Sequence, residues 1–238
     1  AGVTLNQNFD TLQEALDAPY SDVAEAYYAV RSSLELSSNK GLPPSLMVTS
    51  SNKGEGKSTT SYVLARDLAR LGRKVLLIDG DLRRPSLHRF FEVPTGAPGL
   101  SSVLAKLVPA DEAIRPAVDG QLSFMPSGPL PPDPANLFAG TAVDDLLTQL
   151  TERFDVVVVD APPVMALADA VELASAADAT IFVVEAGTAH FGQARTAVSR
   201  LVRGRSNVIG CVVTKYNPRK VGYTDDSDYY NYSYSKDG

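Results

Sequence analysis

A glycine-rich segment at residues 45–60 constrains the fold of this chain more than any other part of the sequence. It opens with a short apolar run at residues 46–48, which predicts a buried strand. The chain then passes through Gly54 and Gly56 and enters a helical pattern at Lys57. This succession of strand, glycine turn and helix start indicates a phosphate-binding loop, because backbone N–H groups and a helix N-terminus together attract anions.

The same loop carries the residue types that bind phosphates and magnesium. We expect Lys57 to meet the β- and γ-phosphates and the Ser58 hydroxyl to bind Mg²⁺. The strict pattern has glycine at position 51, where this chain has Ser51, so the loop is a deviant Walker A motif. An ordinary surface loop rich in Gly, Ser and Lys is the alternative. The expected nucleotide-binding residues are Asn52, Lys53, Gly54, Glu55, Gly56, Lys57, Ser58 and Thr59.

Three aspartates follow strand-like apolar runs. Asp79 and Asp81 come after residues 75–78, whose lack of alternation predicts a strand buried on both faces. Asp160 ends a run of four valines at residues 156–159. Ligands of open α/β sheets bind at the carboxyl ends of the strands, so we expect metal-linked roles for these aspartates. Turns with solvated or capping carboxylates are the alternative.

Strand-like and helix-like segments alternate along the chain. The expected strands are 46–48, 74–78, 121–125, 154–160, 179–185 and 207–214, and the expected helices begin near Ser21 and Lys57 and span 135–150 and 190–203. Such alternation predicts an α/β fold with a mostly parallel, doubly wound sheet and helices on both faces, of the P-loop NTPase type. We expect residues 1–20 to be irregular and residues 21–216 to form the domain.

Composition limits the class of protein. The 238 residues are 44% hydrophobic and 21% charged, as in an ordinary soluble domain. The net charge of −6 argues against bulk affinity for nucleic acid or anionic lipid. The one cysteine, Cys211, forms no internal disulfide, and its apolar neighbours predict a small core residue. No apolar run reaches the roughly 18 residues of a membrane span.

The C-terminal segment, residues 217–238, differs in composition from the rest. It has almost no aliphatic residues, so it is unable to bury a core, and we expect a flexible tail. An acidic solubilising tail is one interpretation, but tyrosines do not serve that purpose. Tyrosines clustered among aspartates indicate phosphorylation, and the expected acceptors are Tyr223, Tyr229, Tyr230, Tyr232 and Tyr234.

In combination, the deviant loop, the Asp79-Gly-Asp81 strand end, the strand ending at Asp160 and the tyrosine-rich tail resemble one family. The chain resembles, from about residue 21 onward, the cytoplasmic catalytic domain of the bacterial tyrosine kinases that accompany export of capsular and extracellular polysaccharide. The resemblance implies an autokinase that uses ATP and Mg²⁺. It implies catalytic roles for Lys57, Asp79 and Asp81, with Asp79 near the attacking hydroxyl, and metal-binding roles for Ser58, Asp81 and Asp160.

The resemblance also implies partners and a location. These are a homo-oligomer such as a ring with the tail docked on a neighbour, a transmembrane polysaccharide co-polymerase segment on the same or a separate chain, and a tyrosine phosphatase, without nucleic acid. The expected place is the cytoplasmic face of the bacterial inner membrane, and the start at Ala1 fits an excised domain. The family's ring motif, Glu-x-x-Arg-x-x-Arg, is matched at Glu25 and Arg31 but has Tyr28 in the middle.

Two other functions stay open from the sequence. Partition and septum-placement ATPases share the deviant loop, but their signature lysine corresponds to Asn52 here, and Lys53 is one place too late. A non-catalytic nucleotide-gated regulator of a polysaccharide polymerase is the other. Arg83 and Arg84 are expected either to steady the tail or the phosphates or to be solvated, and residues 214–217 to approach a purine base.

Overall fold

The computed structural model describes most of the chain. The described residues are 2–3, 12–18, 21–36, 41–94, 96–117, 120–166 and 168–216. The whole of residues 217–238, with the five expected phosphoacceptor tyrosines, lies outside them. The expected boundary of a tail at residue 217 therefore stays a prediction.

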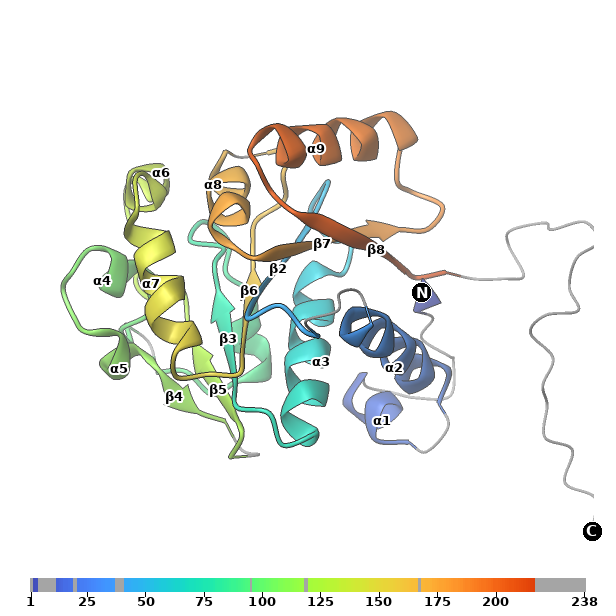
Figure 1. The fold of residues 1–238 in the computed structure, drawn as a ribbon, viewed down its shortest axis with the longest axis horizontal. Coiled ribbons are helices and arrows are strands. Elements are labelled where there is room, and N and C mark those ends of the chain that lie inside the picture. The colour runs from blue at the N-terminus through green and yellow to red at the C-terminus, as the bar shows by residue number, and fades with distance from the viewer. Residues whose placement is uncertain are drawn as a thin grey trace, which may run out of the picture.

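A single sheet organises the described part of the chain (Figure 1). Its eight strands there are ordered β1-β8-β7-β2-β6-β3-β5-β4, and only the pair β4 and β5 is antiparallel. The strands are β1 (Gly2–Val3), β2 (Ser45–Ser50), β3 (Val75–Asp79), β4 (Arg115–Pro116), β5 (Leu122–Met125), β6 (Val156–Asp160), β7 (Ala179–Glu185) and β8 (Val208–Thr214). The predicted mostly parallel, doubly wound sheet is confirmed.

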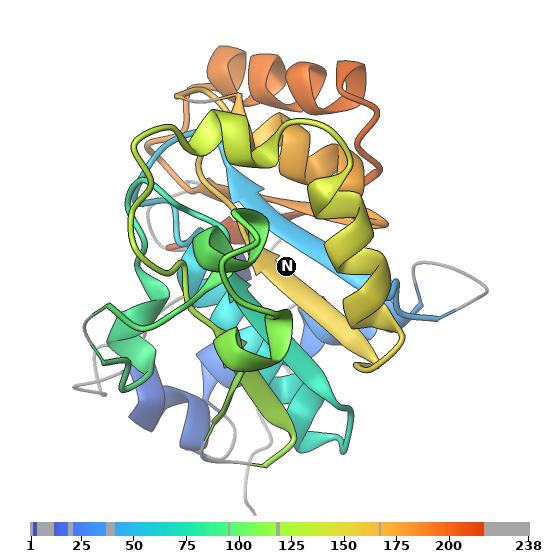
Figure 2. The ribbon, with the colours of Figure 1, turned by 90° about the vertical axis from the view of Figure 1, so that its left-hand side faces the viewer.

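Helices cover both faces of this sheet (Figures 1 and 2). One face carries α1 (Leu12–Asp17), α2 (Asp22–Glu35), α3 (Lys57–Arg70) and the 3₁₀ helix η1 (Leu87–Phe90). The other carries α4 (Leu100–Leu104), α5 (Ala110–Ala113), α6 (Pro134–Phe138), α7 (Ala142–Thr151), α8 (Asp169–Ala176) and α9 (Phe191–Arg203). Leu46 and Val48 pack in the first core while Met47 packs in the second. The strands are unbroken apolar runs because both of their faces are buried.

Two local predictions are corrected by the structure. The single helix expected at 135–150 is two helices, α6 and α7, because the chain turns at Gly140 with φ of 80°. The segment 1–20, expected to be irregular, includes β1 and α1. Helix α1 forms there because Ala15 and Leu16 reach the core.

The prediction that Cys211 is a core residue is also wrong. Cys211 is exposed. On its outer side β8 pairs only with the two residues of β1, in register with Val213 and Thr214, so no described strand flanks Cys211 there. Separately, no helix in the described ranges is long and apolar enough to cross a membrane.

Helix α2 begins as its sequence predicts. Ser21 is the N-cap, and its hydroxyl accepts a hydrogen bond from the Ala24 N–H at 3.0 Å. The residues of the incomplete ring motif follow on this helix. Tyr28 is exposed, and the Arg31 guanidinium lies 4.7 Å from the centroid of its ring, so the tyrosine engages this arginine by a cation–π contact.

Strand order brings the polar strand ends together. Strand β6 lies between β2 and β3, and Asp79 is the register partner of Asp160. Val48 of β2 is paired with Asp160 from the other side. The three segments that the sequence singled out therefore meet at one edge of the sheet.

Candidate active site

The phosphate-loop segment folds as a tight turn between β2 and α3. Gly54 and Gly56 have φ of 90° and 93°, in the left-handed region that favours glycine. The buried Glu55 carboxylate accepts a hydrogen bond from the Asn52 N–H at 2.8 Å, which closes the loop on itself. The Thr214 hydroxyl donates to the Glu55 carbonyl at 2.6 Å, so the end of β8 holds the loop in place.

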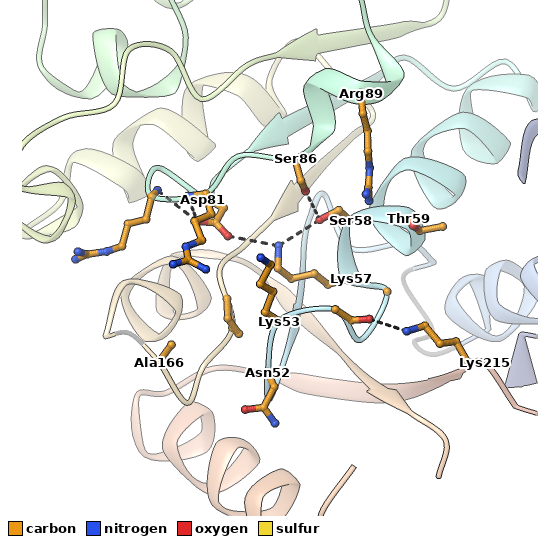
Figure 3. Close-up of a pocket in the computed structure, with 15 residues that line it drawn as sticks. Asn52, Lys53, Lys57, Ser58, Thr59, Asp81, Ser86, Arg89, Ala166 and Lys215 are labelled. Carbon is orange, nitrogen blue, oxygen red and sulfur yellow. Dashed lines mark hydrogen bonds and ion pairs between the residues drawn. The ribbon is translucent and has the colours of Figure 1, made fainter. Parts of the chain in front are cut away.

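Lys57 lies between two carboxylates, that of Asp81 in the pocket lining and that of the buried Asp160, and Figure 3 shows its contacts with Asp81 and Ser58. Its Nζ is 3.6 Å from Asp81 Oδ2 and 3.5 Å from Asp160 Oδ1, and it donates to Ser58 Oγ at 3.2 Å. The hydroxyls of Ser58 and Ser86 are 2.7 Å apart. One buried cation therefore joins the phosphate loop to the strand-end aspartates.

Asp79 holds the loop that follows β3. Its Oδ2 accepts hydrogen bonds from the N–H groups of Ser86 and Leu87 at 3.1 and 3.0 Å, and its Oδ1 accepts from the Asp81 N–H at 3.3 Å. Burial, reinforced by the negative charge of Asp160, raises the pKa of Asp79 to about 7. Only 1% of Asp79 is exposed, and it lies beneath the pocket wall.

Asp160 has capacity for a further partner. It is fully buried, and burial raises its pKa although the Lys57 cation acts in the opposite direction. Ser61 donates to its Oδ1 at 3.2 Å, whereas its Oδ2 has no hydrogen-bond partner among the described residues. An orphaned carboxylate oxygen is costly in the interior. A hard cation with its water shell would satisfy it, so the residues here fit Mg²⁺.

Protein carboxylates alone do not make this a metal site. In the described part of the chain, no three His, Cys, Asp or Glu side chains converge closely enough to hold a metal ion. Mg²⁺ commonly keeps several waters and binds through one or two carboxylates plus substrate phosphates. Ser58, Asp81 and Asp160 suit that mode of binding.

A pocket of about 660 Å³ opens above these residues. This volume falls in the range of about 300–1,000 Å³ that small-molecule sites occupy. The lining includes one carboxylate, Asp81, against six cations: Lys53, Lys57, Arg83, Arg84, Arg89 and Lys215. In a chain of net charge −6, this concentration of positive charge marks the pocket as a site for an anion.

The structure brings together most of the residues expected from the sequence. Among the expected nucleotide-binding residues, Asn52, Lys53, Gly54, Gly56, Lys57, Ser58 and Thr59 line the pocket, as does Asp81. Glu55 is buried and closes the loop, and Asp79 and Asp160 lie behind the wall. Asn52, at the position of the ATPase signature lysine, donates from Nδ2 to Gln193 Oε1 at 3.1 Å.

Several site residues were not found from the sequence. Ser86 and Arg89 reach the pocket because the loop after β3 folds back over Asp79, and nothing in their local pattern signals this. Asp169, the first residue of α8, pairs with Arg83. Lys215, by contrast, belongs to the segment 214–217 that was expected near a purine base, and it lines the pocket, donating to the Gly54 carbonyl at 3.0 Å and to Glu185 Oε2 at 2.8 Å.

Comparison with known proteins agrees with this geometry. The family model named ParA, described as NUBPL iron-transfer P-loop NTPase, matches residues 43–213. Tyrosine-protein kinase YwqD of Bacillus subtilis is 35% identical over 216 residues, covering 91% of this chain and 90% of YwqD. The kinase domain of Escherichia coli tyrosine kinase ETK superposes with a TM-score of 0.85 at 27% identity, covering 98% of this chain and 94% of that structure. The chimerical protein CapA2B2 gives 0.80 at 25% identity, covering 90% and 92%.

The fold and its glycine loop define the class of this protein as a P-loop NTPase of the ParA type. The sequence identity of 35% to YwqD, over nine-tenths of that kinase, then narrows the class. The chain belongs to the bacterial tyrosine-protein kinases, and its activity is that of a protein-tyrosine kinase.

Proposed function

We propose that this kinase uses ATP to phosphorylate its own tyrosine cluster and thereby regulates the synthesis and export of capsular or extracellular polysaccharide. The acceptors are Tyr223, Tyr229, Tyr230, Tyr232 and Tyr234. The observation that carries the proposal is the placement of Lys57 between Asp81 and Asp160, beneath a cationic pocket, in a chain related to tyrosine kinases.

The nucleotide side of the pocket is assigned to the phosphate loop. Lys57 and the backbone N–H groups at Gly54 and Gly56 bind the phosphates, because a helix N-terminus and a cation favour negative charge. Ser58 and Asp81 contact Mg²⁺, and the free oxygen of Asp160 holds its water shell. Magnesium, when bound, supplies the charge neutralisation on which phosphoryl transfer depends.

Asp79, the last residue of β3, and Asp81, two positions further on, serve the acceptor side of the site. A tyrosine hydroxyl has a pKa near 10, so a carboxylate that orients it or takes its proton assists attack. Asp81 reaches the pocket wall and orients that hydroxyl. As the tyrosine oxygen bonds to the γ-phosphorus and the bond to the β–γ bridging oxygen breaks, ADP leaves and the phenolic proton passes to water. Asp79 fixes the loop in position, because its Oδ1 accepts a hydrogen bond from the Asp81 N–H.

Chain connectivity supports the tyrosine cluster as substrate. Lys215 lines the pocket, and the first tyrosine of the cluster, Tyr223, follows eight residues later. An extended chain spans up to about 3.5 Å per residue, so this tyrosine is within reach of its own pocket or that of a neighbour. We propose transfer between subunits of a homo-oligomer, in which phosphorylation adds about −1.5 to −2 charges per tyrosine and loosens the assembly.

The cellular setting is part of the same proposal. The kinase works at the cytoplasmic face of the inner membrane with a transmembrane co-polymerase segment, fused or separate, and a tyrosine phosphatase reverses its action. Co-purification with the co-polymerase from solubilised membranes, lost when residues 217–238 are phosphorylated, tests this setting. Equal co-purification of the phosphorylated and unphosphorylated kinase with the co-polymerase would contradict the regulatory role.

The kinase is tested with γ-labelled ATP and Mg²⁺ on three full-length chains: the natural sequence, Lys57→Met, and a chain with the five cluster tyrosines changed to phenylalanine. Phosphotyrosine on the natural chain alone is the expected result. Free phosphate without labelled protein would instead establish a partition-type ATPase. Bound ATP without turnover would establish a nucleotide-gated binding module.

A further inference from the structure

The six cations of the pocket differ in whether a carboxylate already neutralises them. Lys57, Arg83 and Lys215 pair with aspartate or glutamate side chains. Lys53, Arg84 and Arg89 have no carboxylate partner among the residues that the structure describes. Lys53 belongs to the phosphate loop. The remaining two are Arg84, in the loop after β3, and Arg89, in η1, and we call this pair, which has no carboxylate partner in the described part of the chain, the arginine wall.

The backbone beneath the arginine wall is firmly held. The Arg84 N–H donates to Asp81 Oδ1 at 2.9 Å, which fixes one end of the wall to a site carboxylate. At the other end the Phe90 ring stacks on Tyr62 with centroids 4.2 Å apart. Arg89 lies over the Phe90 ring at 4.9 Å and extends from η1 toward Ser58 (Figure 3). The fold thus presents two exposed arginines on a firmly held backbone, and no described carboxylate pairs with either of them.

We propose that the arginine wall recognises the acceptor, selecting tyrosines that have carboxylates close by in the sequence. The inference rests on the proposed function, since it concerns the acceptor side of the same pocket. Guanidinium groups bind carboxylates through paired hydrogen bonds. This chain carries matching groups, because Asp228 immediately precedes Tyr229 and Asp225 and Asp226 lie shortly before it. The expected substrate class is therefore an acidic tyrosine peptide.

This assignment separates the wall from the nucleotide site. If Arg84 and Arg89 served the phosphates of ATP, their loss would raise the KM for ATP with every acceptor. If they serve acceptor carboxylates, their loss raises the KM for acidic acceptors only. The two roles are therefore distinguished by varying the charge of the acceptor.

The test uses the full-length chain with its five cluster tyrosines changed to phenylalanine, so that an added peptide is the only cluster-derived acceptor. One peptide has the sequence of residues 221–236, and a second has asparagine at the positions of Asp225, Asp226 and Asp228. Each is assayed with the unaltered wall, with Arg84→Gln plus Arg89→Gln, and with Arg73→Gln. Arg73 is the matched control, because it is exposed just beyond the far end of α3 from the phosphate loop.

Loss of both wall arginines is expected to raise the KM for the acidic peptide roughly tenfold, the scale of two exposed ion pairs. The KM for the asparagine peptide and that for ATP stay unchanged, and Arg73→Gln alters none of them. Arg84→Lys plus Arg89→Lys restores part of the acidic-peptide affinity because the charge is kept. Thermal melting confirms that the variants are folded.

Three outcomes overturn the inference. An equal rise in KM for both peptides means that the arginine wall does not recognise the carboxylates of the acceptor. A rise in the KM for ATP means that it belongs to the nucleotide site. If neither peptide gains phosphotyrosine, and the natural chain with its tyrosines intact gains none either, the proposed autokinase is wrong as well. If both peptides are labelled equally well whatever their charge, only the role of the arginine wall is wrong.

Discussion

Arg83 and Asp169 form an ion pair across 86 positions of sequence, with Arg83 Nε donating to Asp169 Oδ2 at 2.7 Å. A second hydrogen bond joins Arg83 Nη2 to Asp169 Oδ1 at 3.3 Å, so the contact is bidentate. Asp169 begins α8 and is buried, while Arg83 follows Asp81 and keeps 38% of its side chain exposed. The pair therefore ties the loop of the site aspartates to the first turn of α8.

Breaking this pair is expected to destabilise the protein. Arg83→Gln leaves a buried carboxylate without its cation, which should lower the free energy of unfolding by about 1–3 kcal/mol. Arg84→Gln is the matched control, because the neighbouring arginine has no carboxylate partner in the described part of the chain, and its effect should stay within about 0.5 kcal/mol.

A double-mutant cycle completes this test by urea unfolding. Asp169→Asn removes the charge that Arg83 neutralises, so Arg83→Gln with Asp169→Asn should cost less than the sum of the single changes. The expected coupling is about 1 kcal/mol. Additive costs would show that the ion pair contributes nothing to the stability of the loop.

Stability should depend on the titration of Asp79 in the protein without nucleotide and metal. Burial and the Asp160 charge raise the pKa of Asp79 to about 7, whereas an unfolded aspartate ionises near pH 3.9. Between these values the folded state holds a proton that the unfolded state releases. Stability from this group is therefore full below about pH 4 and is lost as the pH rises toward about 7, by at most about 1.4 kcal/mol per pH unit.

Asp79→Asn isolates this contribution. Urea unfolding of both proteins at about pH 5 and about pH 7 should show a smaller fall in stability for the asparagine variant, since its side chain does not titrate. Parallel pH dependences of the two proteins would contradict the assigned protonation of Asp79.

The phosphate loop offers a comparison between two glycines of similar conformation. A Cβ at Gly56 would lie 3.1 Å from Thr214 Cγ2, whereas a Cβ at Gly54 would meet no atom within 4 Å. Both positions have positive φ, so each alanine costs about 1–2 kcal/mol of backbone strain. Gly56→Ala should cost more, because it also pushes on the threonine that holds the loop.

The measurement is the unfolding free energy of Gly54→Ala and Gly56→Ala without nucleotide, where only contacts within the protein count. Equal losses of unfolding free energy in the two variants would mean that Thr214 moves aside without cost and does not constrain the loop.

Local sequence patterns predicted the main strands and helices but not the contacts between segments that are distant in sequence. The valine run before Asp160 and the strand–glycine–helix order around Lys57 are local signals, and β6 and α3 form where they predict. The break between α6 and α7 was missed, because it depends on the positive φ that Gly140 adopts in the folded chain. Exposure of Cys211 was also missed, because it depends on the short length of β1, a strand far away in sequence.

The candidate site shows the same division. Lys57, Asp81 and Asp160 follow predicted strands or the predicted loop, and a parallel sheet brings such positions to one edge. Arg83 with Asp169, and Ser58 with Ser86, are contacts between loops and helix ends. Their geometry depends on the three-dimensional path of the chain after β3, for which the sequence has no periodic signal.

Peptide mass mapping shows whether this pocket phosphorylates the tyrosine cluster. Lysines at 220 and 236 bound the cluster, so trypsin releases all five tyrosines on one peptide, residues 221–236. After incubation with ATP and Mg²⁺, this peptide should carry one or more phosphates in the natural chain and none in Lys57→Met. An unmodified peptide from the natural chain, accompanied by release of free phosphate, would contradict the account.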